Sequence, residues 1–480
     1  MFYFFLKGAA GSRQHLFLGE CSEIPIGKMP HKAYTIRTCI KKDYYIAMNK
    51  TDNQEICLLN DSFPPEVDGV ANAVVNYARV ISAAGKNVSV VTPQCPGADD
   101  SSWNYPVIRY PSIDLRDTIG YTAGNPFSIP TLVELTQRNI CLLHSHCPVM
   151  SNTIARALRE SMDIPFILTY HTKFDIDISN AIKLKGLQAG AIRALVHSVG
   201  ACDELWVVSE GAGKNIRQLG YKGDYIVMPN GVDMPKQRVS DSEILSATGA
   251  FDLPENVPVF LFVGRLMWYK GLRIIFDALA ALKSRKLDFR MVLIGGGGDE
   301  VEVKQYAEKL GLGDKVIFTG KIFSRTTLAA WYCRADLLLF PSTFDTNGLV
   351  VREAAACSLG TVLVSGSCAA EGVVDGTDGL LIDENAASLA VCLAQVMNNR
   401  DMMKQIGTNA ANNLYFSWDD SVKNAMERYE IVLDGYKRGR YSKRRDLSDE
   451  MFALSGDIID FLVLAEEHKA LLEEKLERYM

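Results

Sequence analysis

The chain has 480 residues, of which 48% are hydrophobic and 22% are charged, and its formal net charge is −6. A chain of this length exceeds the size at which one hydrophobic core stops growing, so we expect two or three domains. The acidic balance argues against a general nucleic-acid-binding protein, which usually carries a basic excess. The eleven cysteines include no C-x-x-C pair, which favours reduced thiols in the cytoplasm over a disulfide framework or a zinc site.

Residues 1–53 show no sustained helical or strand periodicity. Their apolar start, MFYFFL, is too short for a membrane-spanning helix, and no positive residue precedes it as in a signal peptide. No later run approaches the ~20 apolar residues that a spanning helix needs. We expect residues 1–53 to be a poorly ordered extension, and Met48 suggests an upstream start codon as its origin. The alternative is a small element packed on the first domain.

From Glu55 onward, short apolar runs rich in β-branched residues alternate with amphipathic helices such as Ala71–Ala84 and Ser151–Met162. The first series of predicted strands is ICLLN, NVSVVTP, VIRYP, ICLLHSH, PFILTYH, ELWVVSE and YIVMPNG. The second series is PVFLFVGR, MVLIGGGG, KVIFTG, DLLLFPS, TVLVSG and GLLID. Buried strands that alternate with helices predict parallel sheets covered on both faces.

The polar stretch from Met234 to Val257, which contains Pro235 and Pro254, separates the two series and is interpreted as a linker. We therefore predict an α/β fold with two Rossmann-like, doubly wound domains that face each other across a cleft. In such domains, ligands bind beyond the carboxyl ends of the strands. The predicted segments are an acceptor domain at 54–233, a nucleotide-sugar domain at 234–415, a crossover helix at 416–437, and a basic linker with a helical tail at 438–480.

The segment VGRLMWYKG places two cations, Arg265 and Lys270, after a predicted buried strand and before a helix. Two fixed cations at a strand end can neutralise a diphosphate without a metal and stabilise the charge that grows on it as it leaves. The alternative is a pair of solvated surface charges.

The segment PSTFDTNGLVVREAAAC follows the strand DLLLFPS, and a helix is expected to begin near Gly348. Unpaired amides at a helix start can receive phosphate, and a carboxylate one turn later can accept hydrogen bonds from ribose hydroxyls. The predicted donor-binding residues of this segment are Asp345, Asn347, Gly348, Leu349, Val350 and Glu353. The alternative is an acid that only favours the helix dipole, followed by an exposed glutamate.

Three further segments follow predicted strands. Gly69 permits close backbone approach at the start of a helix, and His146 lies in HSHCP, where it could bond a sugar hydroxyl or stabilise charge. A structural histidine is the alternative. The segment YHTK supplies the acceptor candidates His171, Thr172 and Lys173.

Two other patterns are weaker. The glycines 295–298 do not spell a complete dinucleotide fingerprint, so we interpret them as a tight turn beside the nucleotide. Asp175 and Asp177 superficially resemble a metal-binding D-x-D pair, and we interpret their spacing as coincidence. We therefore predict no metal and no cofactor.

Together these segments resemble the family 4 retaining glycosyltransferases, the glycogen-synthase-like group with the GT-B fold. The resemblance covers residues 55–436 and rests on a glycine loop, H-x-H-x-P, PNGVD, G-R-x4-K-G and an acidic E-x7-E element, in that order. Two positions depart from the family: Asp345 stands in place of the first glutamate, and Asp68-Gly69 stands where many members have two glycines.

The resemblance implies a bacterial-type enzyme that moves a hexose from a nucleoside-diphosphate sugar, commonly a UDP-sugar, to a hydroxyl acceptor. It implies that Arg265 and Lys270 bind the diphosphate, Glu353 the ribose, Asp345 the transferred sugar and His146 a sugar hydroxyl. The details TYHTKFDIDI and FDTNGLVVREAAACSLG look most like members that glucosylate diacylglycerol.

A lipid acceptor would bring the protein to the inner face of the membrane. Lys183, Lys185 and Arg193 share one predicted helix with Leu184, Leu187 and Ile192, and KRGRYSKRR adds a second basic cluster. Such clusters contribute about 1 kcal/mol per charge at an anionic membrane, although a solvated face explains them equally well. A sugar-nucleotide epimerase and a non-catalytic partner subunit remain the alternatives to a transferase.

Overall fold

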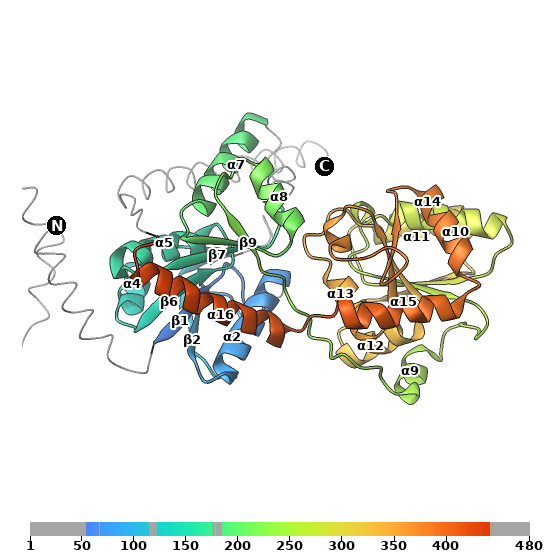
Figure 1. Ribbon diagram of the computed structural model, residues 1–480, viewed down its shortest axis with the longest axis horizontal. Helices are drawn as coiled ribbons and strands as arrows, with labels where there is room; N and C mark the ends of the chain where they lie inside the picture. Colours follow the sequence, from blue (N-terminus) through green and yellow to red (C-terminus); the bar gives the residue numbers. More distant parts are fainter. Residues whose placement is uncertain (1–53, 67, 115–121, 175–177, 179–184, 442–480) are drawn as a thin grey trace, which may run out of the picture. The chain divides into compact units, whose positions relative to one another are not determined.

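The computed structural model describes residues 54–66, 68–114, 122–174, 178 and 185–441 (Figure 1). The predicted extension at 1–53, the pair Asp175 and Asp177, Lys183 and the tail beyond residue 441 lie outside the described residues.

The first sheet has seven strands, and all of their pairings are parallel. All seven strands of the first predicted series are present; the inner strands are short apolar runs that are buried in the sheet, whereas the edge strand β9 is only partly buried. In spatial order the strands are β3 (Val107–Tyr110), β2 (Asn87–Pro93), β1 (Glu55–Leu59), β6 (Ile140–Ser145), β7 (Phe166–Tyr170), β8 (Glu204–Val207) and β9 (Tyr225–Val227).

Helices lie in most of the connections between these parallel strands, whereas β2 and β3 are joined by residues 94–106 without a helix. The two predicted helices are present with slightly earlier starts. The helices of this part are α2 (Gly69–Ala83), α4 (Ile129–Thr136), α5 (Met150–Met162), α7 (Lys185–Val199) and α8 (Glu210–Gln218).

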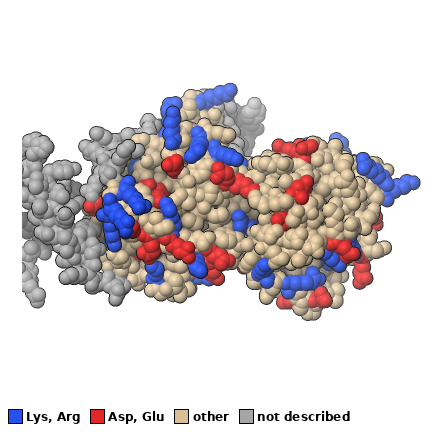
Figure 2. Space-filling view, viewed as in Figure 1, with Lys and Arg blue, Asp and Glu red and all other residues tan. Residues whose placement is uncertain are grey.

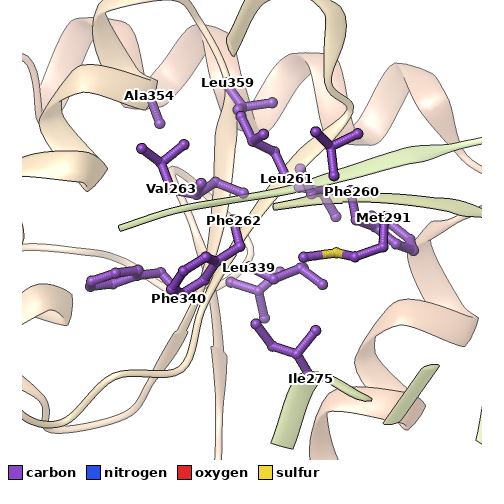
Figure 3. Close-up of a cluster of buried hydrophobic side chains, with 14 of the residues drawn as sticks. Phe260, Leu261, Phe262, Val263, Ile275, Met291, Leu339, Phe340, Ala354 and Leu359 are labelled. Atoms are coloured by element: carbon purple, nitrogen blue, oxygen red, sulfur yellow. The ribbon is translucent and has the colours of Figure 1, made fainter. Parts of the chain in front are cut away.

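The second sheet has six strands, again all parallel. Its spatial order is β12 (Val316–Gly320), β11 (Arg290–Ile294), β10 (Val259–Val263), β13 (Leu337–Phe340), β14 (Gly360–Val364) and β15 (Leu380–Ile382). Figure 3 shows its core, where Phe262 of β10 and Phe340 of β13 stack with ring centres 6.1 Å apart. The adjacent aromatic rings fix the two central strands on which the candidate site is built.

The helical elements of the second part lie before and between its strands, and the last three follow β15. They are α9 (Asp241–Thr248), the 3-10 turn η2 (Trp268–Lys270), α10 (Leu272–Ser284), α11 (Glu300–Lys309), α12 (Arg325–Arg334), α13 (Leu349–Ala356), the 3-10 turn η3 (Cys368–Ala370), α14 (Ala386–Val396), α15 (Arg400–Asn413) and α16 (Trp418–Lys437).

Both sheets have the strand order of a Rossmann-like fold. In each, the first strand lies at the centre, the next two extend to one side, and the later ones continue on the other side. The doubly wound α/β prediction is therefore confirmed for both parts of the chain.

The predicted linker from Met234 to Val257 is wrong in part, because it contains α9. Ser240 caps this helix and forms a capping box with Glu243, and α9 packs against α12. The S-x-x-E spacing was a readable helix-start signal. The prolines in the same stretch favour a linker, but they lie outside α9 and do not interrupt it.

The helix α16 returns from the second part of the chain to the first. It packs against α2, as Figure 1 shows, and Trp418, Val422 and Tyr429 join the hydrophobic core of the first sheet. The end of the described chain thus contributes to the interior of its first domain.

A small antiparallel sheet of β4 (Ser112–Asp114) and β5 (Thr122–Gly124) was not predicted. Strands of three residues are too short to show a periodic pattern. Figure 2 shows acidic and basic side chains interspersed over the visible face. Among the helices that the structure describes, none has the length and apolarity needed to cross a membrane.

Candidate functional site

The predicted site residues follow the strands at which the order of each sheet reverses. In the first sheet the reversal lies between β1 and β6, and Gly69 and His146 come after these strands. In the second sheet it lies between β10 and β13, which precede Arg265 and Asp345. At such switch points the connecting loops diverge to opposite faces and leave space for a ligand. The topology therefore brings these residues to positions typical of ligand binding.

Lys270 and Asp345, which were predicted as separate donor contacts, form an ion pair. Nζ of Lys270 lies 2.6 Å from Oδ1 of Asp345, and Oγ of Ser342 donates to Oδ2 at 2.6 Å. Lys270 is 7% exposed, so the alternative of a solvated surface charge is wrong for this residue. A buried ammonium needs a partner, and Asp345 supplies it.

Gly271 explains how Lys270 reaches Asp345. Its φ is 78°, and a Cβ at this position would lie 2.3 Å from the carbonyl oxygen of Pro341. Because no side chain fits, the turn after β10 packs directly against the loop after β13. The glycine that follows the lysine in the motif therefore allows the close approach on which the ion pair depends.

Arg265 is exposed and makes no ion pair with any residue that the structure describes. Its guanidinium carbon lies 6.0 Å from the ring centre of Tyr269, and this ring contacts that of Phe344 with centres 4.4 Å apart. Nζ of Lys270 lies 5.7 and 5.4 Å from the same two ring centres. The two cations thus border an aromatic pair, which the sequence analysis did not identify because its members are 75 residues apart.

The helix α13 begins at Leu349, and Gly348 precedes it with a φ of 56°. This confirms the predicted helix start. A Cβ on Gly348 would lie 2.8 Å from Cα of Ala369, so glycine is required sterically as well as conformationally. No side chain caps this helix, so its first amides keep their capacity to bind an anion.

Glu353, on α13, is almost buried: its side chain is 14% exposed, so the alternative of an exposed glutamate is wrong. The hydroxyl of Tyr332 donates to Oε2 at 2.9 Å, and Arg325 donates to Oε1 at 3.2 Å. Burial raises the pKa of the Glu353 carboxyl, while the contacts with Tyr332 and Arg325 oppose this shift. Sequence reasoning missed Arg325 and Tyr332, because neither belongs to a motif.

The predicted acceptor residues contact the loop that carries Asp345. Nζ of Lys173 donates to the carbonyl oxygen of Thr343 at 3.2 Å. Oγ1 of Thr346 donates to the backbone carbonyl oxygen of His171 at 2.7 Å. Thr172, between them, is half-buried.

Asn347 also bonds residues that follow the first sheet. In the amide orientation that satisfies its neighbours, its side chain donates to the carbonyl oxygen of Val208 at 3.3 Å and accepts from the backbone amide of Asn230 at 3.2 Å. The loop with the second acidic motif is therefore tied to segments of the first domain.

The start of α2 differs from that of α13. Oδ1 of Asp68 accepts hydrogen bonds from the amides of Val70 and Ala71, both at 2.8 Å, and Oδ2 accepts from the hydroxyl of Ser62. A Cβ on Gly69 would meet nothing within 4 Å. Close approach of a ligand to Gly69 is therefore sterically open, but Asp68 already occupies two amides of the helix start.

Three buried histidines cluster where β6 and β7 end. Nδ1 of His146 lies 3.0 Å from Nε2 of His171, because the two residues follow adjacent parallel strands. His144 bonds the hydroxyls of Tyr429 and Thr169 at 2.6 and 2.7 Å. Burial lowers the pKa of His171 to about 3, and it lowers the pKa values of His144 and His146 well below their usual range. All three are neutral near pH 7.

The glycines after β11 pack against the turn that contains Arg265. A Cβ on Gly295 would lie 1.9 Å from the carbonyl oxygen of Gly264, and one on Gly297 would lie 2.4 Å from that of Leu266. The close packing agrees with a tight turn. Within the described residues, no group of three or more acidic, histidine or cysteine side chains is arranged to hold a metal ion.

Comparisons with known proteins find matches to both halves of the chain. Residues 67–235 match the family model Glycosyltransferase Family 4, and residues 248–413 match Glycosyl transferases group 1. An uncharacterized glycosyltransferase of Methanocaldococcus jannaschii is 26% identical over 302 residues, which is 62% of this chain and 78% of the relative. D-inositol 3-phosphate glycosyltransferase 2 of Catenulispora acidiphila is 27% identical over 62% of this chain and 73% of its own length.

Solved structures share the fold. Sucrose-phosphate synthase of Thermosynechococcus elongatus superposes with a TM-score of 0.63 at 19% identity, over 80% of this chain and all of that one. HepE of Anabaena, solved with UDP and glucose, superposes with a TM-score of 0.61 at 19% identity, over 78% of this chain and 99% of that one.

The paired Rossmann-like sheets and these superpositions define a protein with the GT-B fold. Its two parts are similar to glycosyltransferases: the segment that matches Glycosyltransferase Family 4 precedes the one that matches Glycosyl transferases group 1.

Proposed function

We propose that this protein transfers a hexose, with retention of anomeric configuration, from a nucleoside-diphosphate sugar to a hydroxyl acceptor. The observation that carries the proposal is the grouping of two cations, an uncapped helix start and a nearly buried carboxylate after β10 and β13. These are Arg265, Lys270, the amides at 349–350 and Glu353. Each suits a different part of a nucleotide-sugar, and HepE, with a similar fold, was solved with UDP and with UDP-glucose.

In the proposed mechanism, the amides of α13 and the two cations hold the diphosphate. They stabilise the charge that develops as the bond between the anomeric carbon and the phosphate oxygen breaks. Glu353 accepts from the ribose hydroxyls, while Asp345 and His146 orient the transferred sugar. The acceptor oxygen attacks the anomeric carbon from the face that the phosphate leaves, and its proton passes to the leaving phosphate.

A panel of nucleotide-sugars, screened for protection against thermal unfolding, tests the donor. A ligand at 100 times its Kd adds ~2.7 kcal/mol to the stability of the folded state. We expect a UDP-sugar to protect the wild type and to protect Glu353→Ala less at the same concentration. If no nucleotide or nucleotide-sugar protects the wild type, the donor assignment is wrong.

Turnover separates the transferase from the two alternatives. A transferase releases nucleotide only with an acceptor present, an epimerase changes the sugar without one, and a non-catalytic subunit does neither. Nuclear magnetic resonance of the product gives the anomeric configuration and therefore tests retention.

The proposal includes independence from metal ions, because Arg265 and Lys270 supply the positive charge at the diphosphate. We expect chelation with EDTA to leave turnover unchanged. Loss of turnover that Mg²⁺ or Mn²⁺ restores would contradict this part of the proposal.

The identity of the sugar is proposed to depend on Asp345, whose carboxylate is one methylene shorter than the glutamate of the resembled family. Each carboxylate oxygen offers two acceptor sites, so Asp345 can bond a sugar hydroxyl in addition to Lys270 and Ser342. We expect Asp345→Glu to change the ranking of the sugars in the panel. An unchanged ranking would exclude this role.

Two acceptor classes merit direct comparison. Some relatives are named D-inositol 3-phosphate glycosyltransferases, whereas the sequence resemblance suggests diacylglycerol at the cytoplasmic face of a membrane. The exposed Lys185 and Arg193 of α7, beside the half-buried Leu187 and Ile192, support contact with an anionic surface. Co-sedimentation with anionic vesicles at low salt tests this contact, and assays with each acceptor class test the acceptor.

A further inference from the structure

The ring nitrogens of the three buried histidines have unequal sets of partners. Both nitrogens of His144 bond hydroxyls, which makes it a structural residue. His146 has one bonded nitrogen: its Nδ1 faces His171, while its Nε2 is buried without a hydrogen-bond partner among the described residues. A buried imidazole nitrogen without a partner is rare unless a ligand completes it. His146 is therefore the member of the cluster that is available to a ligand.

The protonation of His171 follows from its neighbour Asn230. Nδ2 of Asn230, which can only donate, lies 3.4 Å from Nδ1 of His171. Nδ1 must therefore be the bare, accepting nitrogen. A neutral imidazole has one N–H, so its proton is on Nε2, and burial keeps His171 neutral by lowering its pKa to about 3.

The protonation of His146 follows in turn. Nε2–H of His171 donates to Nδ1 of His146 over 3.0 Å, so Nδ1 of His146 is the bare nitrogen and its Nε2 carries the proton. The plane of the ring is also fixed, because His144 lies against it with ring centres 4.1 Å apart. Both the tautomer and the orientation of His146 are thus set by residues around it.

We propose that His171 is a positioning residue, which with Asn230 sets the tautomer of His146 so that Nε2–H donates a hydrogen bond to a ligand oxygen. This inference rests on the proposed function in one respect: the ligand is taken to be the nucleotide-sugar or its acceptor. The ligand atom must then be an acceptor, such as a hydroxyl, ring or phosphate oxygen. His146 does not serve as a general base, because its only accepting nitrogen is occupied by His171.

The tautomers can be read directly from nitrogen-15 chemical shifts of the histidine rings in the full-length protein, with His146→Gln to assign the signals. We expect protonated Nε2 and bare Nδ1 for both His146 and His171. The opposite pattern, or two tautomers in comparable populations, would overturn the proposal. This measurement requires no substrate, so it stands even if the proposed glycosyl transfer fails.

A matched pair of variants tests the role of His171. The amide nitrogen of glutamine can replace the Nε2–H donor, whereas leucine has a similar size and no donor. We expect His171→Gln to keep the His146 tautomer and His171→Leu to lose it. The kcat/KM of His171→Leu should then fall about tenfold below that of His171→Gln, as expected for the loss of about one oriented hydrogen bond.

Circular dichroism and thermal unfolding establish that the two variants remain folded. If His171→Leu keeps the tautomer of His146, or if the two variants have equal kcat/KM, His171 has no positioning role. Should His171→Leu fail to fold, the tautomers of the wild type and of His171→Gln still decide the question.

Discussion

The two domains have the same strand order but place different kinds of residues at their switch points. In both, loops follow the strands at which the order of the sheet reverses, which are β1 and β6 in the first domain and β10 and β13 in the second. In the first domain, Asp68 caps the helix that follows, and buried neutral histidines lie beside it. In the second, Gly348 leaves the helix start uncapped, and Lys270, Arg265 and Glu353 provide charge. A diphosphate suits the second switch point, and uncharged hydroxyl groups suit the first.

The largest expected effect concerns the charge of the second switch point. Lys270→Ala removes a buried cation and should lower kcat roughly 10²–10³-fold, the cost of removing one electrostatic contact to a developing charge. Lys304→Ala is the control, because Lys304 on α11 is half-exposed, pairs with Glu300 and lies over the ring of Phe318, none of which belongs to the candidate site. Steady-state kinetics measures both, and an equal effect in the two variants would contradict a specific role of Lys270 at the second switch point.

The next effect concerns acid stability and should be confined to the first domain. His171 has a folded pKa of about 3, below its unfolded value of ~6.5, so the unfolded state binds the extra proton as the pH falls. Its contribution to stability is present above pH ~6.5 and is lost toward pH 3, at up to about 1.4 kcal/mol per pH unit. Urea unfolding between pH 4 and 8 measures this slope.

Glu353 gives the contrast, because its pKa is raised and the sign of its effect is reversed. Its contribution should decline as the pH rises from the unfolded value of ~4.3 through the folded one. His171→Gln should flatten the wild-type slope between pH 4 and 6.5. A slope that persists unchanged in this variant would assign the acid sensitivity to other groups.

A smaller effect compares the glycines at the two helix starts. Gly348→Ala places a side chain at a φ of 56° and 2.8 Å from the backbone of Ala369, which should lower the free energy of unfolding by at least ~1–2 kcal/mol. Gly69→Ala meets open space and should be neutral or stabilising by up to ~1 kcal/mol. Chemical denaturation of both variants tests the difference, and equal losses would contradict it.

The smallest effect concerns the cap of α2. Asp68→Ala leaves the amides of Val70 and Ala71 without their acceptor and should destabilise the protein by ~1 kcal/mol. Asp68→Asn keeps an acceptor oxygen and should lose much less. If chemical denaturation gives the two variants the same free energy of unfolding, the side-chain cap of Asp68 does not stabilise α2.

Much of the fold could be predicted from local patterns. The thirteen central strands are short apolar runs, and the start of α13 is marked by Gly348 after a strand. The helix α9 shows the limit of prediction from local patterns. The prolines on both sides of it favour a linker, whereas the capping box of Ser240 and Glu243 favours a helix. The strands β4 and β5 are too short for any pattern to reveal.

The sequence by itself determined the residue types at the site, because G-R-x4-K-G and the acidic segment each fit within a few consecutive residues. Only the tertiary structure decided how these residues are paired. Lys270 meets Asp345 across 75 positions, and Tyr429 meets His144 across 285. Such pairings depend on strand order and helix packing, which bring distant segments together, and one-dimensional patterns do not record these contacts.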